Sequence, residues 1–185
     1  YPIDFCAMTP LQVENSLDKL HLINNLIIGG AAVSEVLKSK LMHFKTNIFE
    51  TYGMSETLSH IALKRLSPSK DDYFTIFDGV QISLDDRGCL AIYAPNINSD
   101  FLQTNDLVHI INPKQFVFLG RVDNVINSGG AKILPEQLEK LAKEQIDREI
   151  IYLGIKDDLL GQKLVAVIEG ESNDDIEYKV MHLDY

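Results

Sequence analysis

The 185-residue chain is 45% hydrophobic, which is typical of a globular protein with one core or two small ones. Its 27 acidic and 17 basic residues give a net charge of -10, which argues against broad contact with nucleic acid or an anionic membrane surface. No apolar run approaches the roughly 20 residues that span a bilayer, and the start Tyr1-Pro-Ile-Asp4 has no signal-like basic segment. Because the chain also begins without methionine, we expect it to be a fragment of a longer protein.

The two cysteines, Cys6 and Cys89, stand in apolar surroundings and lack the spacing of metal ligands. We therefore expect both to be reduced, buried side chains of a cytoplasmic protein, and neither is a candidate nucleophile.

The first part of the chain alternates helix and strand patterns. Thr9-Pro10-Leu11-Gln12 has the pattern of a capping box and predicts a helix to about Leu20. A buried strand is expected at Leu22–Ile28, followed by the glycine loop Gly29-Gly30-Ala31-Ala32 and a second helix capped by Ser34. Such a loop lets the backbone approach a ligand, although glycines also simply end strands.

A further strand is expected at Asn47–Tyr52, and the αβαβ order implies a parallel sheet with right-handed crossovers. Ligands of open α/β sheets bind at the carboxyl ends of the strands, where this chain has Tyr52-Gly53-Met54-Ser55-Glu56-Thr57. These residues offer an aromatic face for a base, a hydroxyl for a phosphate and a carboxylate for Mg²⁺. A turn with a helix-capping serine is the alternative interpretation.

From Ser59 onward, short alternating segments separated by turn residues predict a small, mostly antiparallel barrel, reached through a linker at Leu66–Asp72. The expected strands are Tyr73–Phe77, Val80–Leu84, Cys89–Ala94, Leu107–Ile111 and Gln115–Leu119.

Two polar groups lie within or beside these strands. Asp106, in Thr104-Asn105-Asp106, can chelate two ribose hydroxyls, and Arg121 offers a planar fork of donors suited to ribose, phosphate or carboxylate. Asp123 follows Arg121 where one unit ends and another begins, which indicates a hinge. An Asx turn and an ordinary surface ion pair are the alternatives.

A compact α/β unit is expected after Asp123. The loop with Gly129 and Gly130 leads to a helix starting at Pro135, and strands are expected at Glu149–Ile155 and Lys163–Glu169. Ser172 is a candidate cap for a final helix that starts at Asn173.

Taken together, Tyr52–Glu56, Thr104–Asp106 and Gly120-Arg121-Val122-Asp123 resemble three motifs of the adenylate-forming superfamily, in the order of that family. The superfamily includes acyl-CoA synthetases, luciferases and the adenylation domains of peptide synthetases. Asn105-Asp106 and Ile126-Asn-Ser-Gly-Gly130 are most similar to the o-succinylbenzoate–CoA ligases of menaquinone synthesis.

The resemblance implies a role for each matched position. It implies that Tyr52 stacks on adenine beside Gly53, that Ser55 contacts phosphate and that Glu56 binds Mg²⁺. By the same resemblance, Asp106 and Arg121 hold the ribose. The resemblance also implies that Gly29-Gly30-Ala31 lies beside the acyl-adenylate, that Asp123 is a domain pivot, and that Gly129-Gly130 contacts the pantetheine arm of CoA. Separately, Ser59, His60 and Lys64 follow the Glu56 block and are candidates to line an acyl pocket. A histidine such as His60 is more often a structural residue.

The sequence also departs from the family pattern. Ser55 replaces a threonine, Asn105 replaces a glycine, and Cys89 stands where a glutamate is common. No lysine-terminated phosphate loop precedes Tyr52, and Lys179 does not have the setting of the adenylation lysine. We therefore expect this chain alone to have no ligase turnover.

The implied fold is α/β plus a β-barrel, followed by a small, incomplete α+β domain; the domains are expected at 1–66, 67–122 and 123–185. The implied reaction is attack of a carboxylate on ATP assisted by Mg²⁺, followed by thioester formation with CoA. The partners would be a small carboxylic acid, ATP and CoA, without nucleic acid or a membrane span, and a homodimer is left open. An adenylation domain that loads a carrier protein and a non-catalytic nucleotide-binding remnant are the alternatives.

Overall fold

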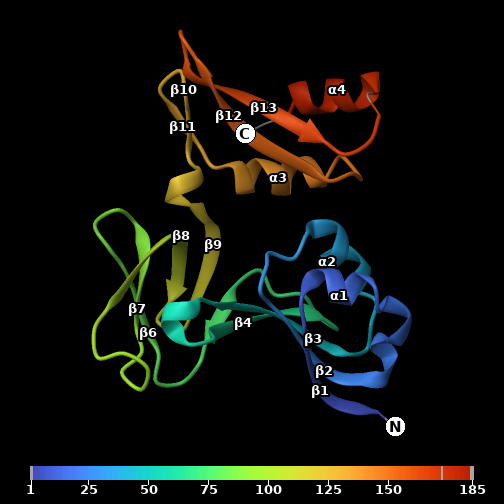
Figure 1. Cartoon of the computed structure of the whole chain (residues 1–185), viewed down its shortest axis with the longest axis vertical. Helices are drawn as coiled ribbons and strands as arrows, with labels where there is room; N and C mark the ends of the chain where they lie inside the picture. The colour runs from blue at the N-terminus through green and yellow to red at the C-terminus, as the bar shows by residue number, and fades with distance from the viewer. Residues whose placement is uncertain (1, 172, 184–185) are drawn as a thin grey trace. The chain divides into compact units, whose positions relative to one another are not determined.

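The computed structural model describes residues 2–171 and 173–183, which form two compact units (Figure 1). Unit 1 comprises Tyr1–Thr104 and Val108–Phe118, and unit 2 comprises Asn105–Leu107 and Leu119–Tyr185. Within the described residues, no helix has the length and apolar character needed to cross a membrane.

Unit 1 starts with three parallel strands, β1 (Ile3–Met8), β2 (Ile23–Ile28) and β3 (Asn47–Gly53). The pairing of Met8 with Ile28, and of Ile28 with Glu50, brings the carboxyl ends of the three strands to the same edge of the sheet. The parallel arrangement of β2 and β3 confirms the prediction. The sequence analysis did not foresee β1, which adds a third strand end to this edge.

The helices α1 (Pro10–Glu14) and α2 (Glu35–Leu41) and the 3₁₀-helix η1 (Leu17–Leu22) share a hydrophobic core with β1–β3, beside which they lie in Figure 1. Both predicted caps are confirmed: the capping box of Thr9 and Gln12 is present, and the Ser34 hydroxyl accepts from the backbone N–H of Leu37 at 3.2 Å. The predicted continuous helix to Leu20 is wrong. The side chain of Asn15 donates to the carbonyl of Leu11, so it competes with the backbone where α1 ends.

The remaining strands of unit 1, for which a small antiparallel barrel was expected, pair antiparallel and join the sheet of the three parallel strands. Strand β4 pairs antiparallel with β3, so the later strands extend the same sheet in the order β1-β2-β3-β4-β5-β9-β8-β7-β6. The bounds of the later strands are β4 His60–Ser67, β5 Phe74–Ile76, β6 Gln81–Leu84, β7 Cys89–Tyr93, β8 Leu102–Asn112 and β9 Gln115–Arg121. Five of these strands overlap the predicted segments, although β8 begins five residues earlier than expected. Strand β4 was not predicted, and its end overlaps the expected linker Leu66–Asp72.

A second core lies under these strands and includes Ile61, Leu90, Ile92 and Phe116, each at most 1% exposed. Cys89 is buried and Cys6 is partly buried, and both are free thiols as expected.

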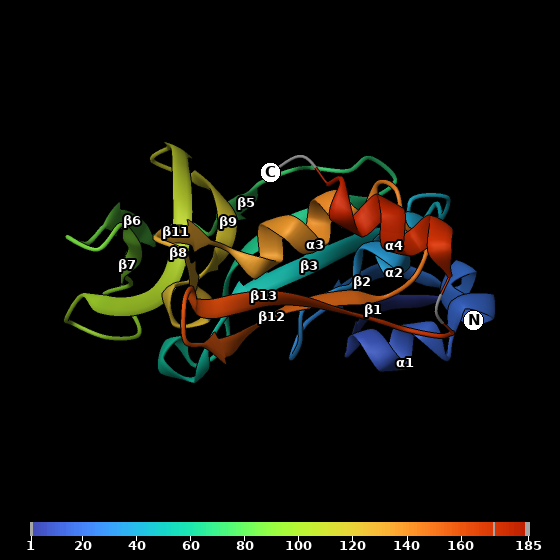
Figure 2. The ribbon, with the colours of Figure 1, turned by 90° about the horizontal axis from the view of Figure 1, so that it is seen from above.

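Unit 2 contains a four-stranded antiparallel sheet in the order β11-β10-β13-β12. Figure 2 shows α3 and α4 on the same side of β12 and β13, and their apolar side chains share one core with that face. The bounds are η3 Val122–Asn124, β10 Ile126–Ser128, β11 Ala131–Ile133, α3 Pro135–Lys143, β12 Ile150–Asp157, β13 Gly161–Ile168 and α4 Asp174–Met181.

The start of α3 at Pro135 agrees with the prediction, whereas the loop around Gly129-Gly130 is the turn of a β10–β11 hairpin. Asn173 caps α4 through its side chain, which accepts from the backbone N–H of Asp175 at 2.9 Å. The predicted cap, Ser172, lies outside the described residues.

Candidate functional site

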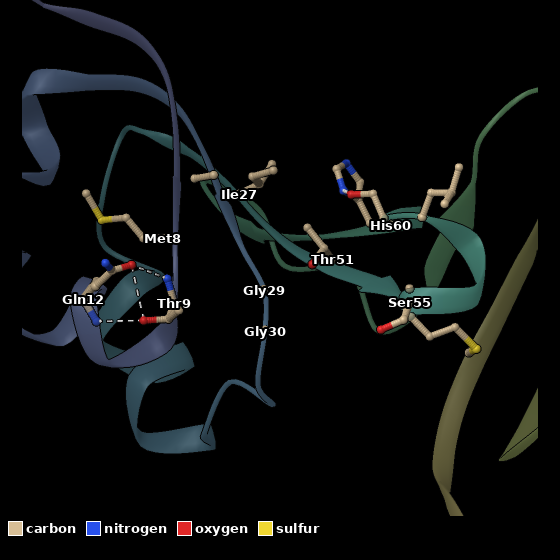
Figure 3. Close-up of a pocket in the computed structure, with 14 residues that line it drawn as sticks. Met8, Thr9, Gln12, Ile27, Gly29, Gly30, Thr51, Ser55 and His60 are labelled. Atoms are coloured by element: carbon tan, nitrogen blue, oxygen red, sulfur yellow. Dashed lines mark hydrogen bonds between the residues drawn. The ribbon is translucent and has the colours of Figure 1, made fainter. Parts of the chain in front are cut away.

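An open cleft of about 500 Å³ lies in unit 1 at the carboxyl ends of β1, β2 and β3 (Figure 3). Each strand contributes the residues that follow it, so the fold brings together segments that are far apart in the sequence. Polar and apolar groups alternate around the cleft. Its lining includes Thr9 and Gln12 after β1, Gly29 and Gly30 after β2, Gly53, Met54 and Ser55 at the end of β3, and Ser59 and His60 beyond.

The glycines allow the backbone segments around this cleft to approach closely. A Cβ on Gly29 would lie 2.4 Å from the hydroxyl oxygen of Thr51, which itself donates to the carbonyl of Ile28. A Cβ on Gly53 would lie 2.2 Å from the carbonyl oxygen of Ser59, a backbone atom. No other residue type fits at position 53 without moving the backbone between β3 and β4.

The η2 turn (Ser55–Thr57) presents two of the predicted ligand-binding side chains, Ser55 and Glu56, both exposed. The buried Thr57 fixes this turn, because its hydroxyl accepts from the N–H of Met54 at 3.0 Å and donates to the carbonyl of Ser59 at 2.6 Å. The following residue, Leu58, has a left-handed backbone (φ 60°) and is 80% exposed.

Tyr52 lies in the hydrophobic core rather than on the surface of the cleft. Its side chain is 9% exposed, and its ring meets Phe116 edge-on at 5.0 Å and tilts against Phe74 at 5.6 Å. Within unit 1, therefore, most of the ring surface is already packed. Stacking of Tyr52 on adenine stays a prediction.

The three candidate acyl-pocket residues do not share one location. Ser59 and His60 line the cleft, with the Ser59 hydroxyl 3.0 Å from Nδ1 of His60. Lys64 is not part of the cleft lining; its Nζ lies 2.6 Å from a carboxylate oxygen of the buried Glu50. Burial lowers the pKa of Lys64, and Glu50 opposes that effect.

In unit 2, the predicted ribose-binding residues are joined directly. Arg121 donates from Nη1 to Asp106 Oδ1 at 2.9 Å and from Nη2 to Asp123 Oδ2 at 3.1 Å. The Asp106 side chain is 7% exposed, whereas Arg121 is 47% exposed, so one guanidinium connects a buried carboxylate to the surface. Asn105 adds a hydrogen bond to Asp123 at 3.0 Å. Asn105 does not need a left-handed backbone, since Leu58 is the one non-glycine residue with positive φ in the described ranges.

The segment after Arg121 is fixed by Glu136 in the first turn of α3. Glu136 Oε1 accepts from the backbone N–H of Arg121 at 3.3 Å and from the Asn124 side chain at 2.7 Å. Gly120 makes room for this carboxylate, because a Cβ there would lie 2.5 Å from Glu136 Oε2. Gly129 and Gly130 both have positive φ in the β10–β11 turn, and Ala31 follows the glycine loop as an exposed residue.

No group of three or more histidine, cysteine or acidic side chains converges as a metal site in the described part of the chain. This does not conflict with the role expected for Glu56, because Mg²⁺ usually needs only one or two protein carboxylates besides phosphate oxygens and water.

The sequence analysis missed several residues of the cleft, namely Thr9, Gln12 and Thr51. The signal for the first two was the segment Ile3–Met8, which is apolar except for Asp4, because a third parallel strand there would have placed Thr9 at the same edge as Gly29.

No family model matches the chain. A 2-succinylbenzoate–CoA ligase of Staphylococcus epidermidis is 24% identical over 95% of this chain and 43% of its own length. The ligase of that name from Haemophilus influenzae is 23% identical over 88% of this chain and 40% of its own length.

The chain is similar in sequence to 2-succinylbenzoate–CoA ligases. The resemblance to adenylate-forming enzymes is thereby confirmed, and the chain spans about two fifths of the length of these curated ligases.

Solved structures show the same fold. An acyl-CoA synthetase (AMP-forming)/AMP-acid ligase II-like protein of Dyadobacter fermentans is 34% identical with a TM-score of 0.63, over 97% of this chain and 54% of that protein. The o-succinylbenzoate CoA synthetase of Bacillus subtilis, in complex with ATP and magnesium ion, is 19% identical with a TM-score of 0.73, over 95% and 44%. These ligase structures match a mixed sheet followed by a second, smaller antiparallel sheet.

Proposed function

We propose that the protein to which this sequence belongs is an AMP-forming acid–CoA ligase, with o-succinylbenzoate as the expected acid. The observation that carries this proposal is the 2.9 Å pairing of Arg121 with Asp106, two residues that the sequence assigns to the ribose. The similarity to 2-succinylbenzoate–CoA ligases supports the choice of reaction and substrate.

In the proposed reaction, the substrate carboxylate attacks the α-phosphorus of ATP and pyrophosphate leaves. The thiol of CoA then attacks the acyl carbon, and AMP leaves. Both steps depend on alignment and on stabilisation of charge more than on a protein nucleophile. That requirement fits a site built from glycine backbone, hydroxyl groups and carboxylates.

In this proposal, each group of described residues has its own role in binding the substrates. Asp106 would accept hydrogen bonds from the ribose hydroxyls, and Arg121 would hold that carboxylate in place. The Gly29-Gly30 loop and Ser55 line the cleft in unit 1, where backbone and hydroxyl groups would contact the acyl-adenylate. Glu56 is the residue that we assign to Mg²⁺, which would neutralise phosphate charge when bound. The hinge role of Asp123, the contact of Gly129-Gly130 with CoA and the acyl-pocket roles of Ser59, His60 and Lys64 remain part of this proposal.

Calorimetric titration of the 185-residue chain with AMP tests the nucleotide site. We expect Asp106→Ala to weaken AMP binding about tenfold or more, because hydrogen bonds to a charged group contribute roughly 1.5–3 kcal/mol. Asp158→Ala, which removes an exposed carboxylate in the β12–β13 turn, is the matched control and should bind as the unchanged chain does. Equal AMP affinities for all three proteins would refute the proposal for Asp106.

The complete gene product tests the reaction and the substrate. We expect it to form thioester with o-succinylbenzoate in preference to benzoate and fatty acids, and we expect Glu56→Gln to slow pyrophosphate release. Binding of nucleotide without any turnover would instead indicate a non-catalytic member of the fold.

A further inference from the structure

The turn between β6 and β7 is a rigid support for one arginine side chain. Asp85 accepts at Oδ1 from the backbone N–H groups of Arg87 and Cys89, both at 2.9 Å. Its own backbone N–H donates to the carbonyl of Cys89, and its carbonyl accepts from Gly88, which has a φ of +78°. The turn therefore has little freedom, and it fixes the starting point of the Arg87 side chain.

The Arg87 guanidinium connects this turn to strand β8. Its Nε and Nη2 donate to Asp85 Oδ2 at 2.9 and 2.7 Å, and Nη2 also donates to the backbone carbonyl of Thr104 at 2.7 Å. Because Asp85 neutralises the guanidinium on one side, Arg87 is not an obvious ligand for a phosphate. Arg87 also donates a directed hydrogen bond to the backbone carbonyl of Thr104.

Thr104 is held from a second direction as well. Its side chain is buried, and its hydroxyl donates to the carbonyl of Leu90 at 2.8 Å. Thr104 and Asp106 are two positions apart on β8, so their side chains share a face and their Cα atoms lie roughly 6.6 Å apart. The hydrogen bond from Arg87 therefore reaches β8 two residues before Asp106, the carboxylate that pairs with Arg121.

We propose that Arg87 is a positioning residue, which sets the backbone of β8 at Thr104 so that Asp106 meets the ribose hydroxyls of a bound nucleotide. The inference rests on the proposed function, since it assumes that Asp106 binds ribose. A displacement of about 1 Å at a binding group is enough to change activity strongly. The Arg87 side chain, by contrast, is 47% exposed, and Asp85 keeps its two backbone hydrogen bonds without it, so we expect the loss of this ion pair to cost the fold little. The position of Arg87 should therefore matter more for the ligand than for the fold.

The test is calorimetric titration of the 185-residue chain with AMP and with 2′,3′-dideoxy-AMP, which lacks both ribose hydroxyls. The unchanged chain is expected to prefer AMP. Arg87→Ala is expected to weaken AMP binding about tenfold and dideoxy-AMP binding by less than about twofold, and Arg87→Lys, which keeps the charge but not the fork, should behave similarly.

Two further variants separate positioning from a loss of structure. Lys114→Ala removes a cation about as exposed as Arg87 (50% against 47%), together with its ion pair to Asp78 at 3.0 Å, and should leave both affinities unchanged. Arg87→Ala combined with Asp106→Ala should bind AMP no more weakly than Asp106→Ala alone, because both changes act on the same contact.

The outcomes are distinct. If the unchanged chain binds neither nucleotide, or binds both equally, the ribose role of Asp106 is wrong and this inference fails with it. If the unchanged chain prefers AMP but Arg87→Ala keeps that preference, or loses affinity for both nucleotides equally, only the positioning role of Arg87 is overturned.

Discussion

Gly29 and Thr51 approach each other closely at the cleft, and this approach depends on the absence of a single methyl group at position 29. A Cβ at position 29 would lie 2.4 Å from Oγ1 of Thr51 and 3.6 Å from its Cβ. The hydroxyl cannot rotate away without losing its hydrogen bond to Ile28. This contact therefore fixes the distance between the glycine loop and β3.

We predict that Gly29→Ala lowers the free energy of unfolding by about 1–3 kcal/mol, the range for overpacking a filled site. Urea unfolding followed by circular dichroism measures the change. In a Thr51→Ala background the same substitution should cost much less, because the obstructing oxygen is gone. An identical cost in both backgrounds would show that the strain lies elsewhere.

At the level of single residues, the sequence predicted where the polar groups lie better than it predicted what they contact. The pairing of Asp106 with Arg121 joins two predicted binding residues, and Gly29, Gly53, Ser55, Ser59 and His60 all line one cleft. The partner of Lys64 could not be predicted, because Glu50 faces it only through the register of β3 and β4. The burial of Tyr52 depends in the same way on rings brought in by β5 and β9.

Among the elements, helix α2 carries an ionic network at its first turn. Glu35 pairs with Lys38 at 2.6 Å and with Lys70 at 3.6 Å. Burial alone would raise the pKa of Glu35, but Lys38, Lys70 and Lys64 together outweigh it and hold the pKa below 4.5. A carboxylate whose pKa is lowered by folding stabilises the folded state while it is ionised.

The lowered pKa of Glu35 determines how the stability of the folded state depends on pH. The contribution of Glu35 should be complete above about pH 4.5 and lost as the pH falls through the lower pKa of the folded state. We therefore predict that Glu35→Gln is less stable than the unchanged chain near neutral pH, and that urea unfolding shows the difference shrinking as the pH falls through the lowered pKa of Glu35. Glu14→Gln, at an exposed position at the end of α1, is the control. A difference that does not vary with pH would contradict the assignment.

Elements with local signals were predicted well, and those decided by long-range pairing were not. The caps at Thr9 and Ser34 and the proline start of α3 depend on residues within one turn, so the sequence contained them. The merger of the later strands into one sheet depends on β4 pairing with β3, and no local pattern in the sequence specifies that pairing. Strand β1 was missed because its neighbour β2 lies beyond an intervening helix.

At the scale of the whole molecule, the two units have separate hydrophobic cores. Leu37 is buried in a core of unit 1, whereas Leu138 is buried in the core of unit 2 with Ala142, Ile146 and Ile150. Among the described core clusters, none includes residues of both units. Each unit therefore has an apolar interior that can be perturbed by itself.

We predict that Leu138→Ala destabilises unit 2 by about 2–5 kcal/mol, the usual cost of a leucine truncated in a core. Native-state amide hydrogen exchange should show lost protection in β12 and β13 and unchanged protection in β2 and β3. Leu37→Ala should give the reverse pattern. Equal loss of protection in both units after either change would mean that the chain unfolds as one cooperative body.

Gly53 ends β3 where the chain turns directly against the backbone of Ser59 and His60, with no room for even one added carbon. In a saturation mutagenesis screen, this position would therefore score as intolerant whether or not any nucleotide is ever bound. Intolerance to substitution at position 53 would show only that two backbone segments lie too close together for a side chain. The chemistry of the protein would have to be inferred from the exposed neighbours Ser55 and Glu56, where a failed substitution has fewer structural explanations.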